Sequence, residues 1–313
     1  MVEKINKYID SLPLNIEPDG LYAPIRYALS VGGKRLRPVL MMLAYELWKE
    51  NGEDVLQQAV ALEMYHNFTL LHDDVMDNAD MRRGRPTVHK KWDVNTAILS
   101  GDNMLCLSVK WMGTNPEVLK TFIDTTIEIN HGQQHDVDFE KRDDVTEEEY
   151  IEMIRLKTSV LLACAVKMGA ILAGAPQADA DLLYKFGEQV GLAFQLQDDF
   201  LEVYGDTKVF GKAIGGDIVS NKKTYMLINA FARANEAQRA QLEFWVNHPS
   251  PDPQEKITVV TELYNEIGIH KMAIDKIKYY FQQSRQYLDQ VQLPAERKAE
   301  LQAYTREMMK REY

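Results

Sequence analysis

Apolar residues recur at three- and four-residue spacing through almost the whole chain, in segments rich in Ala, Leu, Met and Glu. This is the period of helices that bury one face. Sustained apolar/polar alternation rich in Val, Ile and Thr, the pattern of strands, is missing from the sequence. We therefore predict an all-α fold. A length of 313 residues would allow two domains, but with no linker-like segment we expect a single domain over residues 1–313.

Glycine and proline mark where the expected helices end. Residues 78–86 and 205–216 are predicted as loops, and residues 248–253 as a surface loop, because three prolines at alternate positions forbid a helix. The expected helices lie before Pro13, over about 21–30, 39–49, 54–77, 96–112, 116–138, 146–173 and 178–204, from about 222, and in two or three further segments near the end.

The charge balance and the cysteines restrict the class of protein. The chain has 47 acidic and 36 basic residues, a net charge of −11, which argues against a nucleic-acid partner. Charged residues before Pro13 argue against a signal peptide. The sequence has no run of about 18 apolar residues, so we do not expect stable membrane insertion. Cys106 and Cys164 lie in apolar helical stretches and are expected to be buried thiols. We expect a cytoplasmic protein.

The motif LLHDDVMD, residues 70–77, ends an apolar helical pattern. Asp73 and Asp77 are four residues apart, so their carboxylates project from one helical face. Oxygen ligands without clustered Cys or His favour a hard cation, above all Mg²⁺. The alternative is a solvated acidic helix end. The arginines of MRRGRPT, residues 81–87, favour the metal site, because a diphosphate needs both Mg²⁺ and guanidinium groups.

A second acidic motif, FQLQDDFLE, covers residues 194–202. Asp198 and Glu202 share a helical face, with Asp199 about 100° around the helix. This string alone could also be a solvated helix end. Two carboxylate helices that face each other could hold several Mg²⁺ ions on one diphosphate, and the interior of a helical bundle is a usual place for such a site.

Cations also gather near glycines and helix starts. Residues 32–38, GGKRLRP, form a Gly-rich turn with three cations before a helix, suited either to an anion or to ordinary solvation. Further lysines occur at Lys157, Lys212 and Lys222, each of which could be a solvated surface residue. His66 lies two turns before Asp73 on nearly the same face, where it could contact a diphosphate or be a buried structural histidine.

These strings together resemble the trans-isoprenyl diphosphate synthase (polyprenyl synthetase) family, short-chain type. The matching elements are GGKRLRP, LLHDDVMDNADMRRGRPT, Lys157-Thr158, FQLQDDFLEVYGD and GDIVSNKKT, in the family's order from residue 32 to about 224. The resemblance implies a helical bundle around a central apolar cavity and a homodimer. It also implies a prenyltransferase that condenses isopentenyl diphosphate with an allylic diphosphate of C5 to C15.

The resemblance also implies residue roles. Three Mg²⁺ ions per active site are expected at Asp73, Asp74, Asp77, Asp198 and Asp199. The allylic diphosphate is expected to contact Arg82, Lys157, Lys212 and Lys222, with Gln195 nearby. Isopentenyl diphosphate is expected at Lys34, Arg37, His66 and Arg83, and Thr158 near the reacting carbons. One departure is Glu202, which stands where the family commonly has Asp, so its contact with a metal is left open.

Family members limit product length with bulky side chains on the helix below the first motif. Phe68 and Tyr65 lie about 7.5 and 12 Å below Asp73 on a helix, which favours geranylgeranyl diphosphate, with farnesyl diphosphate second. Phe68 could instead be an ordinary core residue. Two other functions stay open: a class I terpene cyclase, for which Lys34, Arg37 and Arg83 would lack a purpose, and a noncatalytic subunit of a heteromeric synthase.

Overall fold

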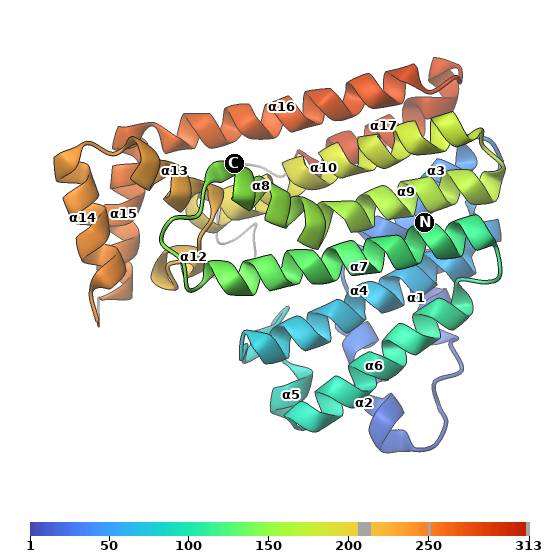
Figure 1. Cartoon of the computed structure of the whole chain (residues 1–313). Helices are drawn as coiled ribbons and strands as arrows, with labels where there is room; N and C mark the ends of the chain where they lie inside the picture. The colour runs from blue at the N-terminus through green and yellow to red at the C-terminus, as the bar shows by residue number, and fades with distance from the viewer. Residues whose placement is uncertain (206–213, 250–251, 311–313) are drawn as a thin grey trace. The chain divides into compact units, whose positions relative to one another are not determined.

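In the computed structural model the chain is helical over most of its length, as the apolar spacing predicted (Figure 1). The structure describes residues 1–205, 214–249 and 252–310. Within these residues, the strands are β1 (Met81–Arg82) and β2 (Arg85–Pro86), which form a short antiparallel hairpin. The all-α prediction is confirmed.

Contacts between Cα atoms divide the chain into two compact units. Unit 1 comprises Met1–Ile123 and Ala165–Ala180, and unit 2 comprises Asp124–Cys164 and Asp181–Tyr313. Three helices have residues in both units: α7 (Pro116–Phe139), α9 (Val160–Ala173) and α10 (Gln177–Tyr204). The expectation of a single domain remains a prediction.

Unit 1 is organised around α4 (Leu56–Met76), which buries seven consecutive residues, 59–65. The helix α6 (Val94–Trp111) packs along α4 (Figure 1). It begins where the Asp93 carboxylate accepts a hydrogen bond from Thr96 N at 2.8 Å. The other elements are α1 (Val2–Asp10), α2 (Asp19–Ser30), α3 (Leu36–Glu46), η1 (Gly52–Val55) and α5 (Val88–Lys91).

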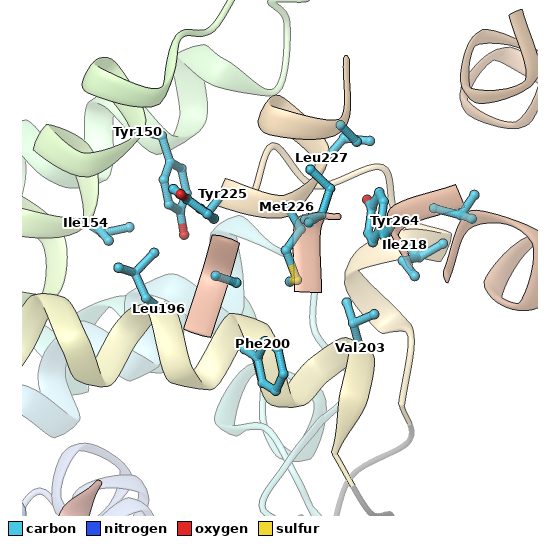
Figure 2. Packing of buried hydrophobic residues seen from close by; sticks show 14 of the residues in the cluster. Tyr150, Ile154, Leu196, Phe200, Val203, Ile218, Tyr225, Met226, Leu227 and Tyr264 are labelled. Carbon is cyan, nitrogen blue, oxygen red and sulfur yellow. The ribbon is translucent and has the colours of Figure 1, made fainter. Parts of the chain in front are cut away.

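Unit 2 has its own apolar core. Figure 2 shows Tyr150, Leu196, Phe200, Tyr225 and Tyr264 among the buried side chains of this cluster. Side-chain caps start several of its helices, as in the capping box at the start of α8. Its elements are α8 (Glu147–Ile154), η2 (Arg155–Ser159), α12 (Gly216–Val219), α13 (Tyr225–Arg233), α14 (Glu236–Asn247), α15 (Pro253–Ile267), α16 (Ile269–Gln290) and α17 (Ala295–Met308).

The structure corrects four sequence expectations. The helix expected over 146–173 is interrupted by η2, a π-helical turn, and the helix expected from about 222 is split into α13 and α14. The loop expected over 78–86 contains the β1–β2 hairpin, whose turn residues Arg83 and Gly84 both have positive φ. Cys164 is buried as predicted, but Cys106 is exposed on α6.

One helical stretch of the described residues, Glu147–Ala173, is long and apolar enough to cross a bilayer by length and composition. In this structure 72% of its apolar window is buried within the protein. Burial of this kind is typical of a core helix.

Candidate active site

The first acidic cluster, Asp73, Asp74 and Asp77, lies at the C-terminal end of α4. A helix C-terminus carries partial negative charge, so each acidic residue there is unfavourable by about 0.3–1 kcal/mol. The last turn of α4 has no basic residue to offset this repulsion. Acidic residues that reduce stability in this way are typical of a cation-binding site.

Arg82, on β1, pairs with two carboxylates of this cluster, closely with Asp74 and more loosely with Asp73, whose Oδ2 lies 3.7 Å from Arg82 Nη2. Its Nε donates to Asp74 Oδ1 at 2.8 Å, and its Nη2 lies 2.6 Å from the same oxygen. Burial raises the pKa of Asp74, and the hydrogen bond from Arg82 opposes that rise. Asp73 is only partly buried and Asp77 is exposed. Asp74 is therefore the carboxylate that positions Arg82 most directly, whereas the side chains of Asp73 and Asp77 are less buried.

Arg83, the next residue of the hairpin, lies against the turn that precedes α3. Its Nη1 donates a hydrogen bond to Gly32 O. A Cβ atom on Gly33 would lie 2.7 Å from Nη1, and Gly33 has φ of 149°. Only glycine allows this approach without displacing the guanidinium. The glycine pair thus brings Arg83 beside the turn that carries Lys34, which is exposed.

His66, on α4, lies among cations of the same unit. Burial lowers the pKa of His66 well below its usual value, and the charges of Arg37, Arg83, Arg82 and Arg35 lower it further. His66 is therefore a neutral imidazole at physiological pH. The structure thus brings together His66, Arg37 and Arg83, three of the four residues expected to hold isopentenyl diphosphate.

Arg35 has a different role from the other cations of the glycine-rich turn. It is buried, its Nη1 donates to Glu63 Oε1 at 2.8 Å, and its other nitrogens donate to Asn6 Oδ1 and Leu29 O at 3.0 Å each. It adopts φ of 52° at the start of α3. Arg35 therefore has a structural role within unit 1, and the sequence did not reveal these contacts.

An aromatic group lies below the first acidic cluster on α4. Tyr65 is buried and Phe68 is half-buried, with ring centroids 5.4 Å apart. Phe122 meets Tyr65 at 5.2 Å, and His72 meets Phe68 at 4.8 Å, both edge to face. A Cβ on Gly101 of α6 would lie 2.4 Å from His72 Nε2, so the backbone of α6 is in close contact with the His72 ring. The two predicted chain-length residues are thus part of one packed aromatic group.

The second acidic cluster, Asp198, Asp199 and Glu202, lies at the C-terminal end of α10, again without a basic residue in the last turn. Asp199 is 4% exposed, and Tyr150 Oη donates to its Oδ2. Gln195 Nε2 donates to Asp199 Oδ1 at 2.9 Å, and Thr158 Oγ1 donates to Gln195 Oε1 at 3.1 Å. Asp199 is held by protein side chains, whereas Asp198 and Glu202 are only half-buried.

Burial raises the pKa of Asp199 to about 7, and the charge of Asp217 adds to the rise. The charge of Lys222, an exposed residue, acts in the opposite direction. Asp217 lies in α12 and Lys222 in the turn that follows it, and this segment lies close to the second acidic cluster, since Gly215 N donates to Glu202 O at 2.7 Å. Asp217 and Tyr150 were not foreseen from the sequence. The acidic residue in GDIVSNKKT was the one available signal for Asp217.

The π-helical turn η2 presents Lys157 and Thr158. A Cβ on Gly132 would lie 2.3 Å from Lys157 N, and one on Gly191 would lie 2.5 Å from Ser159 Cα. The absence of side chains at these two glycines therefore leaves room for the wider backbone of η2. Lys157 Nζ lies 2.6 Å from Asp136 Oδ2, which orients the ammonium. π-helical turns inside α-helices are frequent at functional sites. Lys212, also expected here, lies outside the described residues.

Oxygen donors for a hard cation remain accessible in both units. Within residues 1–205, 214–249 and 252–310, no group of three His, Cys, Asp or Glu side chains is arranged as a complete metal-ligand set. Mg²⁺ commonly takes one or two carboxylates and fills its octahedron with water and substrate phosphates. The pairs Asp73 with Asp77 and Asp198 with Glu202 fit that requirement.

Residues 18–267 match the family model described as polyprenyl synthetase. The chain belongs to this family. Its relatives include the geranylgeranyl diphosphate synthase of Methanosarcina mazei, 44% identical over 236 residues, which are 73% of each chain. The geranylfarnesyl diphosphate synthase of Natronomonas pharaonis is 39% identical over 252 residues, 73% of this chain and 74% of that protein.

Solved structures of polyprenyl synthetases share the fold. The crystal structure of a geranylgeranyl pyrophosphate synthase has a TM-score of 0.93 and 41% identity, and covers 99% of this chain and 98% of its own. A geranylgeranyl pyrophosphate synthase from Corynebacterium glutamicum, complexed with isoprenyl diphosphate and magnesium, has a TM-score of 0.86 and 28% identity, with coverage of 99% and 97%. The predicted family is confirmed, and this polyprenyl synthetase is a short-chain trans-prenyltransferase of isoprenoid biosynthesis.

In this polyprenyl synthetase, Gly132→Ala should reduce both activity and stability. The new Cβ would lie 2.3 Å from Lys157 N and 2.7 Å from Leu156 C, which are backbone atoms and cannot rotate away. We expect a loss of about 1–3 kcal/mol in the free energy of unfolding, and lower turnover because Lys157 moves. Denaturant unfolding and steady-state kinetics measure the two effects. Gly20→Ala is the control, since nothing lies within 4 Å of its Cβ position. Equal behaviour of the two variants would contradict this account of η2.

Asp199→Asn should stabilise the metal-free synthetase at pH 8 by on the order of 2 kcal/mol. The folded-state pKa of about 7 lies above the usual aspartate pKa of 3.8, so the ionised Asp199 destabilises the fold above pH 7. As the pH falls from 7 towards 4, wild-type Asp199 binds a proton and the advantage of the variant should disappear. Thermal melts across this range measure the difference, with exposed Asp275→Asn as control. A difference that does not change with pH would contradict the assignment.

Proposed function

We propose that this polyprenyl synthetase condenses isopentenyl diphosphate with an allylic diphosphate of C5 to C15 in a Mg²⁺-dependent reaction, with geranylgeranyl diphosphate as its main product. The observation that carries the proposal is the pair of acidic clusters, each at the C-terminal end of a helix whose last turn has no basic residue. The magnesium and isoprenyl diphosphate in the Corynebacterium glutamicum structure support it.

Asp73, Asp77 and Asp198 are the proposed Mg²⁺ ligands, with three ions in each active site. Bound Mg²⁺ would neutralise the diphosphate as it leaves the allylic carbon. Asp74 and Asp199 would act behind these ligands, since Asp74 holds Arg82 and Asp199 accepts hydrogen bonds from Tyr150 and Gln195. Glu202 remains a candidate for contact through water.

The proposed role of the cations is to hold the two diphosphates. Arg82, Lys157 and Lys222 would contact the allylic diphosphate, as would Lys212, so that the allylic C–O bond can ionise. The proposed residues for isopentenyl diphosphate are Lys34, Arg37, His66 and Arg83. The double bond of this substrate would attack the allylic cation, and the resulting cation would lose a proton to the released diphosphate. Neutral His66 would donate a hydrogen bond without adding charge. Thr158, bonded to Gln195, would lie near the reacting carbons.

One incubation tests this proposal. Purified protein, labelled isopentenyl diphosphate and C5, C10 or C15 primers should give extended diphosphates with Mg²⁺ and none with EDTA. Separation by chain length must resolve C15, C20 and C25, because one relative is named a geranylfarnesyl diphosphate synthase. Release of diphosphate without elongation would favour the cyclase instead, and a lack of turnover with every primer would favour the noncatalytic subunit.

Phe68→Ala should lengthen the main product by at least one C5 unit. Phe68 is only half-buried and lies between Tyr65 and His72, so its removal would open space below the first acidic cluster. Product analysis with a C15 primer measures the shift. Phe122→Leu is a matched control, because Phe122 contacts Tyr65 from outside α4 and is fully buried. An unchanged product for Phe68→Ala would place the limit on length elsewhere.

We also propose a cytoplasmic homodimer. Family resemblance supports the dimer, as do the exposed apolar side chains of α6, which are Val94, Ile98 and Leu99. Sedimentation velocity tests the oligomeric state, and Leu99→Lys should favour the monomer if α6 lies in the interface.

A further inference from the structure

A buried lysine holds the turn that follows α12. Lys256, on α15, is 2% exposed, and its ammonium donates to Val219 O at 3.2 Å and Asn221 Oδ1 at 2.5 Å. Both acceptors are uncharged. Burial therefore lowers the pKa of Lys256, and an ammonium in such a place is unfavourable compared with a methionine of similar volume. Packing alone does not account for a lysine here.

The residues that Lys256 contacts shape the turn of residues 215–224. Asn221 has φ of 56°, a strained conformation for a non-glycine residue, and its Nδ2 donates to Val246 O at 3.0 Å. Lys222 N donates to Asp217 O at 3.0 Å, which closes the turn. Lys256 thus holds the side chain of Asn221, the residue with positive φ that directly precedes Lys222.

The helix α15 also contacts the start of this segment. Gly215 has φ of 88°, and a Cβ there would lie 2.5 Å from Ile257 Cδ1. A small cavity beside the turn is lined by Asp217, Asn221 and Lys256 together with apolar side chains of α13, α14 and α15. Two of these, Leu227 and Tyr264, appear beside Ile218 in Figure 2. Consecutive residues of α15, Lys256 and Ile257, therefore hold both ends of the segment from Gly215 to Asn221.

We infer that Lys256 is a positioning residue for the allylic diphosphate site, because it holds the turn that carries Asp217 and Lys222 beside Asp199. The inference rests on the proposed function for the identity of the ligand. It rests on the contacts above for the position of the turn. Gly215 N donates to Glu202 O at 2.7 Å, so the turn of residues 215–224 lies against the second acidic cluster, and a shift of this turn would move Asp217 and Lys222 relative to that cluster.

Kinetics of Lys256→Met test this inference. The KM for the allylic diphosphate should rise about tenfold, the effect of weakening one charge-assisted hydrogen bond, while the KM for isopentenyl diphosphate changes less than twofold. In a Lys222→Ala background the same substitution should have little further effect on the allylic KM, because it acts through Lys222. Asn221→Ala, which removes the acceptor, should behave like Lys256→Met.

Lys298→Met is the matched control. Lys298 is also a buried lysine of unit 2, and its ammonium donates to the carbonyls of Leu288, Asp289 and Val291 at 3.1–3.2 Å. Lys298→Met should lower the melting temperature, but it should not raise the KM for the allylic diphosphate relative to the KM for isopentenyl diphosphate. Equal effects of the two lysine variants on both KM values, or fully additive effects of Lys256→Met and Lys222→Ala, would overturn the inference.

Hydrogen exchange separates a failure of this inference from a failure of the proposed function. In Lys256→Met, amides of residues 214–224 should exchange faster, while amides around Lys298 exchange as in the wild type. Unchanged exchange over 214–224 would overturn the inference even if the enzyme is active. Faster exchange in a protein whose wild type neither binds magnesium pyrophosphate nor elongates a primer would overturn the proposed function and leave the role of Lys256 in the turn supported.

Discussion

Asp73→Ala should reduce turnover by about 10²–10³-fold, the loss expected when one electrostatic contact to the leaving group disappears. The neighbouring Asp74 cannot replace it, because its carboxylate is paired with Arg82 at 2.6 Å. The helical fold should survive, since Asp73 lies in the last turn of α4 and is only partly buried. Incorporation of labelled isopentenyl diphosphate measures turnover, and far-UV circular dichroism measures the helix content.

Asp80→Ala provides the comparison for Asp73→Ala. Asp80 is an exposed acidic residue of the same segment that pairs with Lys90 at 3.0 Å. Its removal should leave turnover within about twofold, because exposed pairs of this kind contribute little. Near-normal turnover in Asp73→Ala would remove Asp73 from the proposed metal site.

Arg35→Met should lower the free energy of unfolding by about 3–5 kcal/mol, because it leaves the buried carboxylate of Glu63 without its cation. Both side chains of this pair are 3% exposed, so water cannot take the place of Arg35. Urea unfolding followed by circular dichroism measures the loss. The double variant Arg35→Met with Glu63→Met should recover much of it, because the uncompensated charge is then gone.

The exposed pair of Lys4 and Glu53 is the control for Arg35. Lys4→Met should change the free energy of unfolding by less than about 1 kcal/mol, as is usual for exposed ion pairs. If Arg35→Met changed the free energy of unfolding as little as Lys4→Met, Arg35 would not be the structural cation that its contacts indicate.

The sequence predicted the helices well where one periodic pattern ran between clear breaks. α2, α6, α7 and α10 begin or end within about two residues of the predicted bounds, since glycine, proline and capping residues act locally. The π-helical turn could not be predicted, because it depends on Gly132 and Gly191, which meet it from other helices. The hairpin turn was missed because arginine is not the usual residue at the first positive-φ position of such a turn.

For the candidate site, the sequence pointed to the candidate residues but not to the contacts that distinguish them. Helical spacing grouped Asp73 with Asp77, yet only the structure shows that Asp74 is buried and is the carboxylate that Arg82 contacts most closely. In the same way, the motif gave Asp199 but not Tyr150, which is 49 residues away. Contacts between distant segments decide such roles, and a single sequence does not contain them.

The exposure of one of the two cysteines offers a direct readout of assembly. Cys106 lies on the outside of α6, while Cys164 is enclosed, so a maleimide reagent should modify a single thiol per chain. If copies of the chain associate through α6, labelling of that thiol should slow as the protein concentration rises. A rate that does not depend on concentration would indicate that α6 stays open to solvent.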